Sequence, residues 1–180
     1  KLGIHQKVSN TKSINNVGKD LLNPIAFSIT VSDLFFNIQK FKEGETKFNK
    51  DRAYAFEQQL NENTGYVLSK PLSSYREAEA SGLIPMMIFS PTIVNDGRRL
   101  LISPQHISYL AGHAADSTFN FETTIDELEF QRLYKDQKAT NIRFTSVLRM
   151  NATFPYILPP VSLPSEPVTF VMDAGIRDNT

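Results

Sequence analysis

The sequence predicts an α/β fold, and three observations lead to this prediction. Behind Asn23-Pro24, apolar residues recur every three or four positions, which is the spacing of one face of a helix. Residues 83–89 and 168–172 are apolar runs of strand length, as expected of strands that are buried in a sheet. Asn95-Asp96-Gly97 separates two further apolar runs and is a strong signal for a turn between strands.

Composition divides the chain into three parts. Residues 9–16 are rich in Ser, Asn, Thr and Lys, so we predict a flexible leader over residues 1–18. Residues 19–82 are predicted to be mostly helical, and residues 83–180 to form the α/β portion. The chain has 180 residues, of which 41% are hydrophobic, and this is enough to enclose the core of one domain.

Helix signals follow one another through the first half of the chain. Asn23-Pro24 suits an N-cap followed by the first helical position, so we predict a helix over 24–41 with a broad apolar face. Asn49 is predicted to cap a second helix. Residues 74–77 have the spacing of a capping box, and Gly82 is predicted to end the short helix that this box opens.

Strand signals dominate the second half. We predict that residues 83–89 form a strand that is buried on both faces, and that residues 92–94 and 99–102 form a hairpin next to it. The run 168–172 is predicted to be the last strand.

Two helices and one irregular connection complete the expected order. Residues 124–127 form a second capping box, which predicts a helix through Leu133. Residues 142–150 predict a further helix that Pro155 must end. The prolines between 155 and 167 predict a connection without regular structure.

Charge and composition exclude several classes of function. The net charge is zero and the pI is near 7.0, so the basic surface that binds nucleic acid is not expected. The chain has no cysteine, which excludes disulfides, thiolate metal sites and cysteine nucleophiles. His5, His106 and His113 have no second ligand at metal-binding spacing, so we expect no metal. Without a signal peptide or a membrane-spanning run, the expected location is the cytoplasm or a membrane surface.

Two segments near the C-terminus carry the chemistry. Residues 148–155 read Leu-Arg-Met-Asn-Ala-Thr-Phe-Pro, and the apolar run 168–172 leads directly into Asp173 and the small residues Ala174-Gly175. Ligands of open α/β sheets bind just beyond the carboxyl ends of the strands, so an acid at this position is well placed for catalysis.

This pattern resembles the patatin-like phospholipases. In that family, a segment similar to Arg-x-Ser-Ala-x-Phe-Pro precedes a strand that ends in Asp-Gly-Gly or Asp-Gly-Ala, and the Asp belongs to a catalytic Ser–Asp pair. The resemblance assigns the catalytic role to Asp173, although Asn151 stands where the family usually has Ser and Ala174 replaces the commoner Gly. The positions that support the match are Phe154, Pro155, Ala174, Gly175 and Asn179.

The resemblance implies a three-layer α/β/α fold and hydrolysis of acyl esters in lipids, without metal or organic cofactor. The nucleophilic Ser of that family lies in Gly-x-Ser-x-Gly, but no two glycines of this chain are four positions apart. We therefore expect the chain to be the C-terminal part of a catalytic domain. Alone it should be inactive, and an uncovered sheet edge should make it self-associate.

Two alternatives remain open. Asp173 suits the cap of a tight turn as well as a catalytic acid, because Asp commonly hydrogen-bonds the backbone two residues on. The chain as a whole suits a non-catalytic lipid-binding or structural module of patatin-like shape, which Asn151 and the missing nucleophile favour. Ser90, Ser103 and Ser146 are expected to be structural, and Arg177 is expected to be a solvated surface charge.

Overall fold

The structure is a computed structural model, and it describes residues 23, 40–43, 46–49, 52–111 and 126–178. The chain divides into two compact units, which are Lys1–Ser69 with Tyr156–Pro159 and Lys70–Pro155 with Pro160–Thr180. Several predicted features lie outside the described residues, namely the leader, most of the helix predicted over 24–41, His5, His113 and Asn179.

In the first unit the structure describes a β hairpin inside the part of the chain that was predicted to be mostly helical. Strand β1 (Lys40–Glu43) pairs antiparallel with β2 (Thr46–Asn49). The prediction that the first helix extends to residue 41 is therefore wrong, since that residue lies in β1. Asn49 is the last residue of β2, where it pairs with Lys40, and is not the residue that precedes the next helix.

Helix α3 (Arg52–Asn63) follows the hairpin and confirms the second predicted helix. Its Leu60 is buried, and its Phe56 packs against the buried Leu158 of the returning segment Tyr156–Pro159. A short 3-10 helix, η2 (Val67–Ser69), leads out of this unit.

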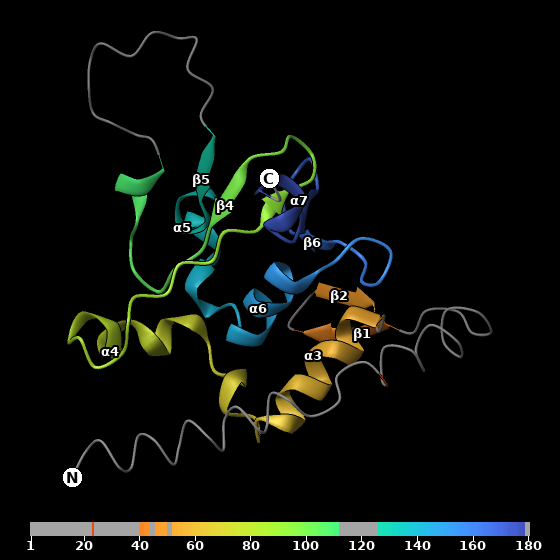
Figure 1. The fold of residues 1–180 in the computed structure, drawn as a ribbon, viewed down its shortest axis with the longest axis horizontal. Coiled ribbons are helices and arrows are strands. Elements are labelled where there is room, and N and C mark those ends of the chain that lie inside the picture. Colours follow the sequence, from red (N-terminus) through yellow and green to blue (C-terminus); the bar gives the residue numbers. More distant parts are fainter. Residues whose placement is uncertain (1–22, 24–39, 44–45, 50–51, 112–125, 179–180) are drawn as a thin grey trace, which may run out of the picture. The chain divides into compact units, whose positions relative to one another are not determined.

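The second unit is built on a mixed five-stranded sheet in the order β5-β4-β3-β7-β6 (Figure 1). The only parallel pair of this described sheet is β4 with β5, and the other neighbours are antiparallel. Because β3 runs antiparallel to both β4 and β7, the strands β4, β5 and β7 point in the same direction. The strands are β3 (Thr92–Ile93), β4 (Arg99–Leu101), β5 (Glu127–Glu129), β6 (Val161–Leu163) and β7 (Thr169–Met172).

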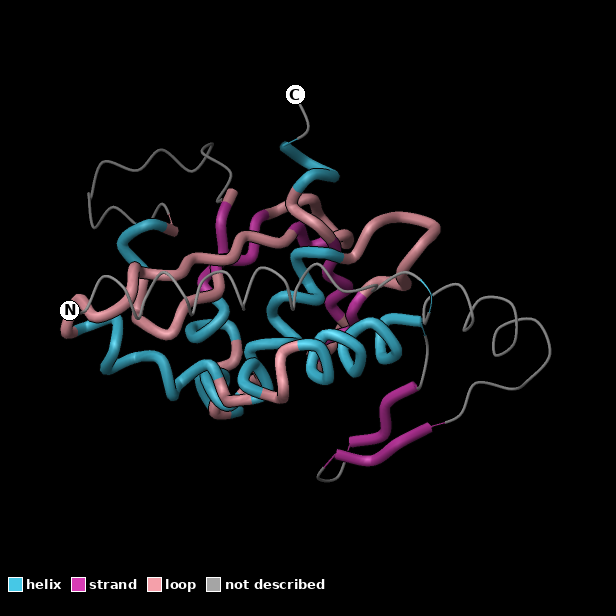
Figure 2. Tube along the Cα trace, turned by 60° about the horizontal axis from the view of Figure 1, so that its bottom comes forward, coloured by secondary structure: helices cyan, strands magenta, loops and turns pink. Residues whose placement is uncertain are grey.

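Short helical segments surround this sheet, and Figure 2 shows α7, next to the C-terminus, above the strands. The α-helices of the second unit are α4 (Arg76–Ala80), α5 (Phe130–Leu133), α6 (Phe144–Ala152) and α7 (Gly175–Asp178). The 3-10 helices are η3 (Leu72–Tyr75), η4 (Ser108–Leu110), η5 (Lys135–Gln137) and η6 (Ala139–Asn141).

The core of this unit lies where α6 meets the sheet. Phe144, Val147 and Met150 recur at steps of three along α6 and are all buried, as one face of an amphipathic helix should be. Val171 of β7 is fully buried as well, and so is Leu100 of β4. The prediction of a helix ended by Pro155 is confirmed, since α6 ends at Ala152.

The predicted hairpin and the predicted last strand are confirmed. Thr92 of β3 pairs with Arg99 of β4 across the expected turn, and Gly97 has the positive φ of 77° that favours glycine. Strand β7 occupies residues 169–172, directly before Asp173.

The prediction of a buried strand over 83–89 is wrong. This segment has no regular structure except at Phe89, which pairs with Ile102. Leu83 is 75% exposed, and the Met87 N–H donates to the Glu79 carboxylate instead of to a neighbouring strand. Pro85 has no N–H to give to a ladder, so apolar composition alone misleads here.

The capping boxes are also not formed as predicted. Tyr75, not Ser74, is the N-cap of α4, and the Ser74 hydroxyl donates backward to the Pro71 carbonyl. At the second box, Glu127 begins strand β5, and the predicted helix through Leu133 is confined to α5, which begins at Phe130. Gly82 does follow the end of α4, with a φ of 71°.

The proline-rich connection contains one strand, contrary to the prediction that it is irregular. Residues 161–163 form β6, which pairs with β7 at the edge of the described sheet. Prolines flank this strand but do not interrupt it, which is where an edge strand tolerates them.

The contrast between Leu100 and Leu83 yields a stability prediction. Leu100→Ala removes a side chain with no exposed surface, so the free energy of unfolding should fall by about 2–5 kcal/mol. Leu83→Ala removes an exposed side chain and should change it by less than about 0.5 kcal/mol. Urea denaturation of both variants measures this difference. Equal losses would mean that the segment 83–89 is buried after all.

Candidate functional site

The structure brings together the two segments that carry the patatin-like pattern. Asp173 directly follows β7, and its backbone N–H donates to the carbonyl of Thr153, at an N···O distance of 3.1 Å. Thr153 is fully buried at the end of α6, where its hydroxyl donates to the Arg149 carbonyl at 2.7 Å. The end of the last strand is thus fixed to the end of the preceding helix.

The Asp173 carboxylate also organises the turn that follows it. Its Oδ1 accepts the N–H of Gly175 at 2.7 Å, and its carbonyl accepts the N–H of Ile176 at 3.3 Å. A Cβ at position 175 would lie 3.3 Å from this Oδ1, so glycine permits the close approach. No donor within the described part of the chain reaches Oδ2, and the side chain is only partly buried.

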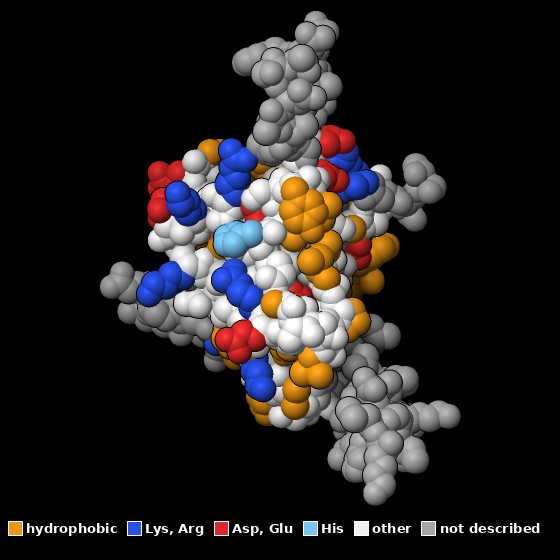
Figure 3. All heavy atoms as spheres, turned by 90° about the vertical axis from the view of Figure 1, so that its left-hand side faces the viewer, with side chains coloured by type: hydrophobic (Ala, Val, Ile, Leu, Met, Phe, Trp, Pro, Cys, Tyr) orange, Lys and Arg blue, Asp and Glu red, His pale blue; other side chains and the backbone are white. Residues whose placement is uncertain are grey.

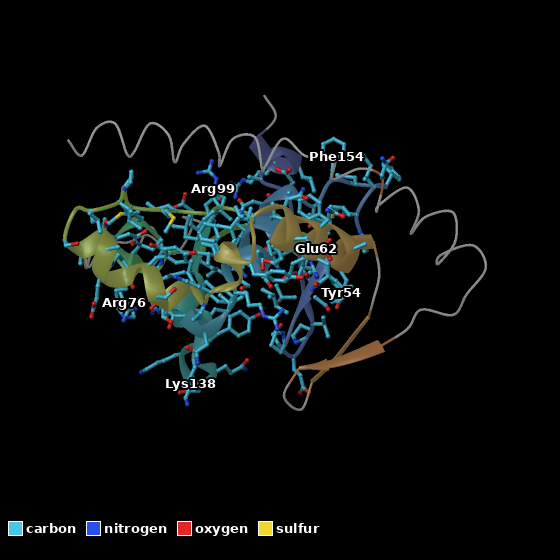
Figure 4. The ribbon with its side chains drawn as sticks, turned by 90° about the horizontal axis from the view of Figure 1, so that it is seen from below. Tyr54, Glu62, Arg76, Arg99, Lys138 and Phe154 are labelled. Carbon is cyan, nitrogen blue, oxygen red and sulfur yellow. The ribbon has the colours of Figure 1, made fainter. Side chains whose placement is uncertain are left out.

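The two segments that meet at Asp173 carry exposed apolar side chains. Phe154 adjoins Thr153 and is 59% exposed, and Figure 4 shows its ring directed away from the body of the ribbon. Ile176, in α7, is 47% exposed. Ala174 is partly buried, and Pro155 lies next to Phe154 at the same turn.

Arg177 is not the solvated charge that the sequence predicted. Its Nη1 donates to the carbonyls of Gly97 and Asp126, at 3.0 and 3.2 Å. Its Nη2 lies 2.6 Å from the Asp126 carboxylate. The guanidinium therefore connects α7 to the β3–β4 turn and to the residue that precedes β5.

The same turn also holds the beginning of β7. The Asn95 side chain donates to the Val168 carbonyl at 3.0 Å and accepts the N–H of Phe170 at 2.8 Å. Within the turn, Asp96 accepts hydrogen bonds from the backbone and guanidinium of Arg98. Partial burial acts to raise the pKa of Asp96, but the bonds from Arg98 outweigh it and hold the pKa below its usual range.

A second polar cluster lies at the carboxyl end of β5. The Glu129 side chain is only 2% exposed, and it accepts the N–H of Ile107 at 2.8 Å and the hydroxyl of Ser108. His106 Nδ1 lies 3.8 Å from the same carboxylate. Sequence reasoning found no carboxylate for His106, because Glu129 comes more than twenty residues later and only the β4–β5 pairing brings it close.

His106 itself is exposed. It is the one histidine in the described part of the chain, and on the face shown in Figure 3 it has Lys and Arg side chains on either side.

Arg76, labelled in Figure 4, contacts the loop that follows β4. Its Nε donates to the Pro104 carbonyl at 2.9 Å.

Gln131 anchors the loop that follows β4. Its Nε2 donates to the carbonyls of Ser103 and Gln105, at 2.8 and 2.9 Å. The buried Ser103 accepts the N–H of Gln105 through its hydroxyl, which is a structural role. The loop after β4 is therefore held by side chains of β5 and α5, and we interpret this second cluster as a structural clamp.

The described residues contain neither a cluster of metal ligands nor a helix that could cross a membrane. Among them, no three His, Asp or Glu side chains are grouped so that they could hold a metal ion. No helix within the same residues is both long enough and apolar enough to span a bilayer.

Comparison of the chain with protein-family models, with curated proteins and with solved structures gave no match. The resemblance to the patatin-like phospholipases therefore rests on the quoted motif residues alone.

The lowered pKa of Asp96 predicts a pH dependence of stability. A carboxyl group with a lower pKa in the folded state stabilises the fold fully above its unfolded pKa of about 3.9, and loses this effect as pH falls through the folded value. The stability difference between the wild type and Asp96→Asn should thus be constant from pH 7 to 5 and shrink below pH 4. Thermal unfolding across pH 2.5–7, with exposed Asp136→Asn as control, measures it. A difference that grows in acid would contradict the assignment.

Proposed function

We propose that this chain carries the acid-bearing part of a patatin-like lipid acyl hydrolase. Asp173 pairs with a serine in a Gly-x-Ser-x-Gly segment that lies outside these 180 residues, within a three-layer α/β/α domain. The observation that carries the proposal is the hydrogen bond between Asp173 and Thr153, which joins the two halves of the motif in space. The carboxylate then stands beyond a strand end, where α/β enzymes place their reacting groups.

The proposed reaction uses the two oxygens of Asp173 differently. Gly175 holds Oδ1, and Oδ2 accepts the serine proton as the serine oxygen attacks the ester carbonyl. The proton passes to the departing alcohol when the ester C–O bond breaks, which leaves an acyl-enzyme. Water then attacks the acyl carbon while Asp173 takes its proton. The bond from that carbon to the serine oxygen breaks, and Asp173 returns the proton to this oxygen, which releases the fatty acid and restores the serine hydroxyl. The reaction as proposed needs no metal or organic cofactor.

A carboxylate is a weak base, so the barrier must be lowered elsewhere too. The unperturbed pKa of Asp is about 3.9, far below that of a serine hydroxyl. Backbone donors aimed at the developing oxyanion therefore supply much of the stabilisation. In the family that the motif resembles, they belong to a glycine-rich loop, which is proposed to lie in the same segment as the serine.

The exposed apolar side chains support a lipid substrate. Phe154 and Ile176 belong to the two segments that meet at Asp173, and both are exposed in the described part of the chain. Acyl chains gain free energy when such surface is removed from water, at about 25 cal/mol per Å². We propose that the protein meets its substrate in the cytoplasm or at a membrane surface, through apolar contacts instead of a basic patch.

A second candidate function is a lipid-binding or structural module without catalysis. The observation in its favour is the hydrogen bond from Gly175 N–H to Asp173, which gives the carboxylate a complete structural role as a turn cap. The same exposed apolar residues would then hold a lipid that is not hydrolysed.

Two substitutions at Asp173 distinguish catalysis from capping. Asp173→Asn keeps an oxygen that can accept the Gly175 N–H but cannot take a proton. In the protein that includes the serine segment, it should lower ester hydrolysis about a hundred- to ten-thousandfold with an unchanged melting temperature. Asp173→Ala should lower both hydrolysis and melting temperature. Hydrolysis of a chromogenic ester and differential scanning calorimetry measure these effects.

The matched control is Asp136→Asn, which changes an exposed aspartate of η5. It should leave turnover and melting temperature unchanged. If Asp173→Asn retains activity within a few-fold of the wild type, Asp173 is a cap and not the catalytic base. A wild-type protein that binds lipid vesicles but hydrolyses no ester would instead support the second candidate function.

The isolated 180-residue chain should show no ester hydrolysis at any pH, because a carboxylate without nucleophile and oxyanion donors cannot lower the barrier. It should also self-associate, since β5 and β6 are the edges of the described sheet and carry free ladder positions. A chromogenic ester assay tests the absence of hydrolysis, and sedimentation velocity tests the self-association. An active monomer would require a nucleophile among Ser90, Ser103 and Ser146.

A further inference from the structure

Asp173 lies inside a closed chain of contacts that starts and ends at one turn. Upstream of it, Asn95 holds β7 by two hydrogen bonds, to Val168 and Phe170. Downstream, Arg177 returns from α7 to the carbonyl of Gly97 in the same turn. The acid is therefore fixed from both sides by residues 95–97.

Helix α7 needs this support, because it has only four residues and makes a single turn. Helix nucleation is unfavourable, and such a short helix in water does not persist by its own hydrogen bonds. The contacts that hold it are the cap from Asp173 at its start and the three acceptors of Arg177 at its end, two of which belong to Asp126.

We propose that Arg177 is a positioning residue for Asp173, an inference that rests on the proposed catalytic role of that acid. Arg177 keeps α7 in place, α7 presents the Gly175 N–H, and this N–H fixes the rotation of the carboxylate so that Oδ2 faces the serine. Neither Arg177 nor Asp126 touches the reacting atoms.

The physical basis is that an acid on a mobile turn samples many orientations, and only a fraction of them allow proton transfer. Errors of about 1 Å in the position of a catalytic group cost about a hundredfold in rate. Arg177 reaches three oxygens from two nitrogens of a planar guanidinium, and the single ammonium nitrogen of Lys cannot reproduce this geometry.

The first experiment is independent of catalysis and uses the 180-residue chain. Arg177→Met keeps the stem of the side chain and removes every donor. Amide hydrogen exchange by NMR should show the Gly175 N–H exchanging about tenfold faster or more, while the N–H of the buried Val171 in β7 keeps its protection.

The matched control is Arg98→Met. Arg98 also forms an exposed ion pair of 2.6 Å at this turn, but its partner is Asp96, within the turn itself. This control should leave the exchange of Gly175 unchanged. Unchanged exchange of Gly175 in Arg177→Met would overturn the proposal, whatever the function of Asp173.

The second experiment measures turnover in the protein that includes the serine segment. Arg177→Met should lower kcat about ten- to a hundredfold with little change in KM or melting temperature. Arg177→Lys should recover only part of this loss, and Arg98→Met should have the kcat of the wild type. If the Gly175 N–H exchanges faster in Arg177→Met but kcat does not fall, Arg177 supports α7 without positioning a catalytic acid. If Asp173→Asn is active as well, the proposed function itself fails.

Discussion

The fold of the second unit depends on the pairing of one very short strand, β3. Thr92 pairs with Arg99 of β4 on one side and with Met172 of β7 on the other. Thr92 and Ile93, both buried, therefore connect the hairpin to the last described strand. Because both pairings are antiparallel, β4, β5 and β7 share one direction, although only β4 and β5 are parallel neighbours. The position of Asp173 at a strand end follows from this arrangement.

Buried polar side chains fix the loops around that sheet. Glu129 and Gln131 would be costly to bury without partners, but Glu129 accepts at least two hydrogen bonds and Gln131 donates to three carbonyls. Such groups hold one conformation strongly, because a different loop path would leave them unsatisfied. Asn95 and Arg177 also hydrogen-bond backbone groups of distant segments, at more exposed positions. These contacts fix the segment around Asp173.

Local signals in the sequence were sufficient where an element needs no distant partner. Asn95-Asp96-Gly97 forms the predicted turn, and the periodic face of residues 144–152 forms the predicted helix. The run before Asp173 forms a strand, as predicted. Residues 83–89 have comparable apolar content but form no strand, because a strand requires a partner and a backbone free to pair, and neither is encoded in composition.

The sequence by itself determined the candidate acid and its small-residue turn, because these are adjacent along the chain. Only the tertiary structure decided that Thr153 binds Asp173, that Arg177 reaches Asp126 across 51 residues, and that Glu129 reaches the loop after β4. These contacts depend on strand order and register, which place residues of distant segments side by side. Residue spacing carries no information about such pairings, so composition and periodicity predicted the elements but not the contacts between them.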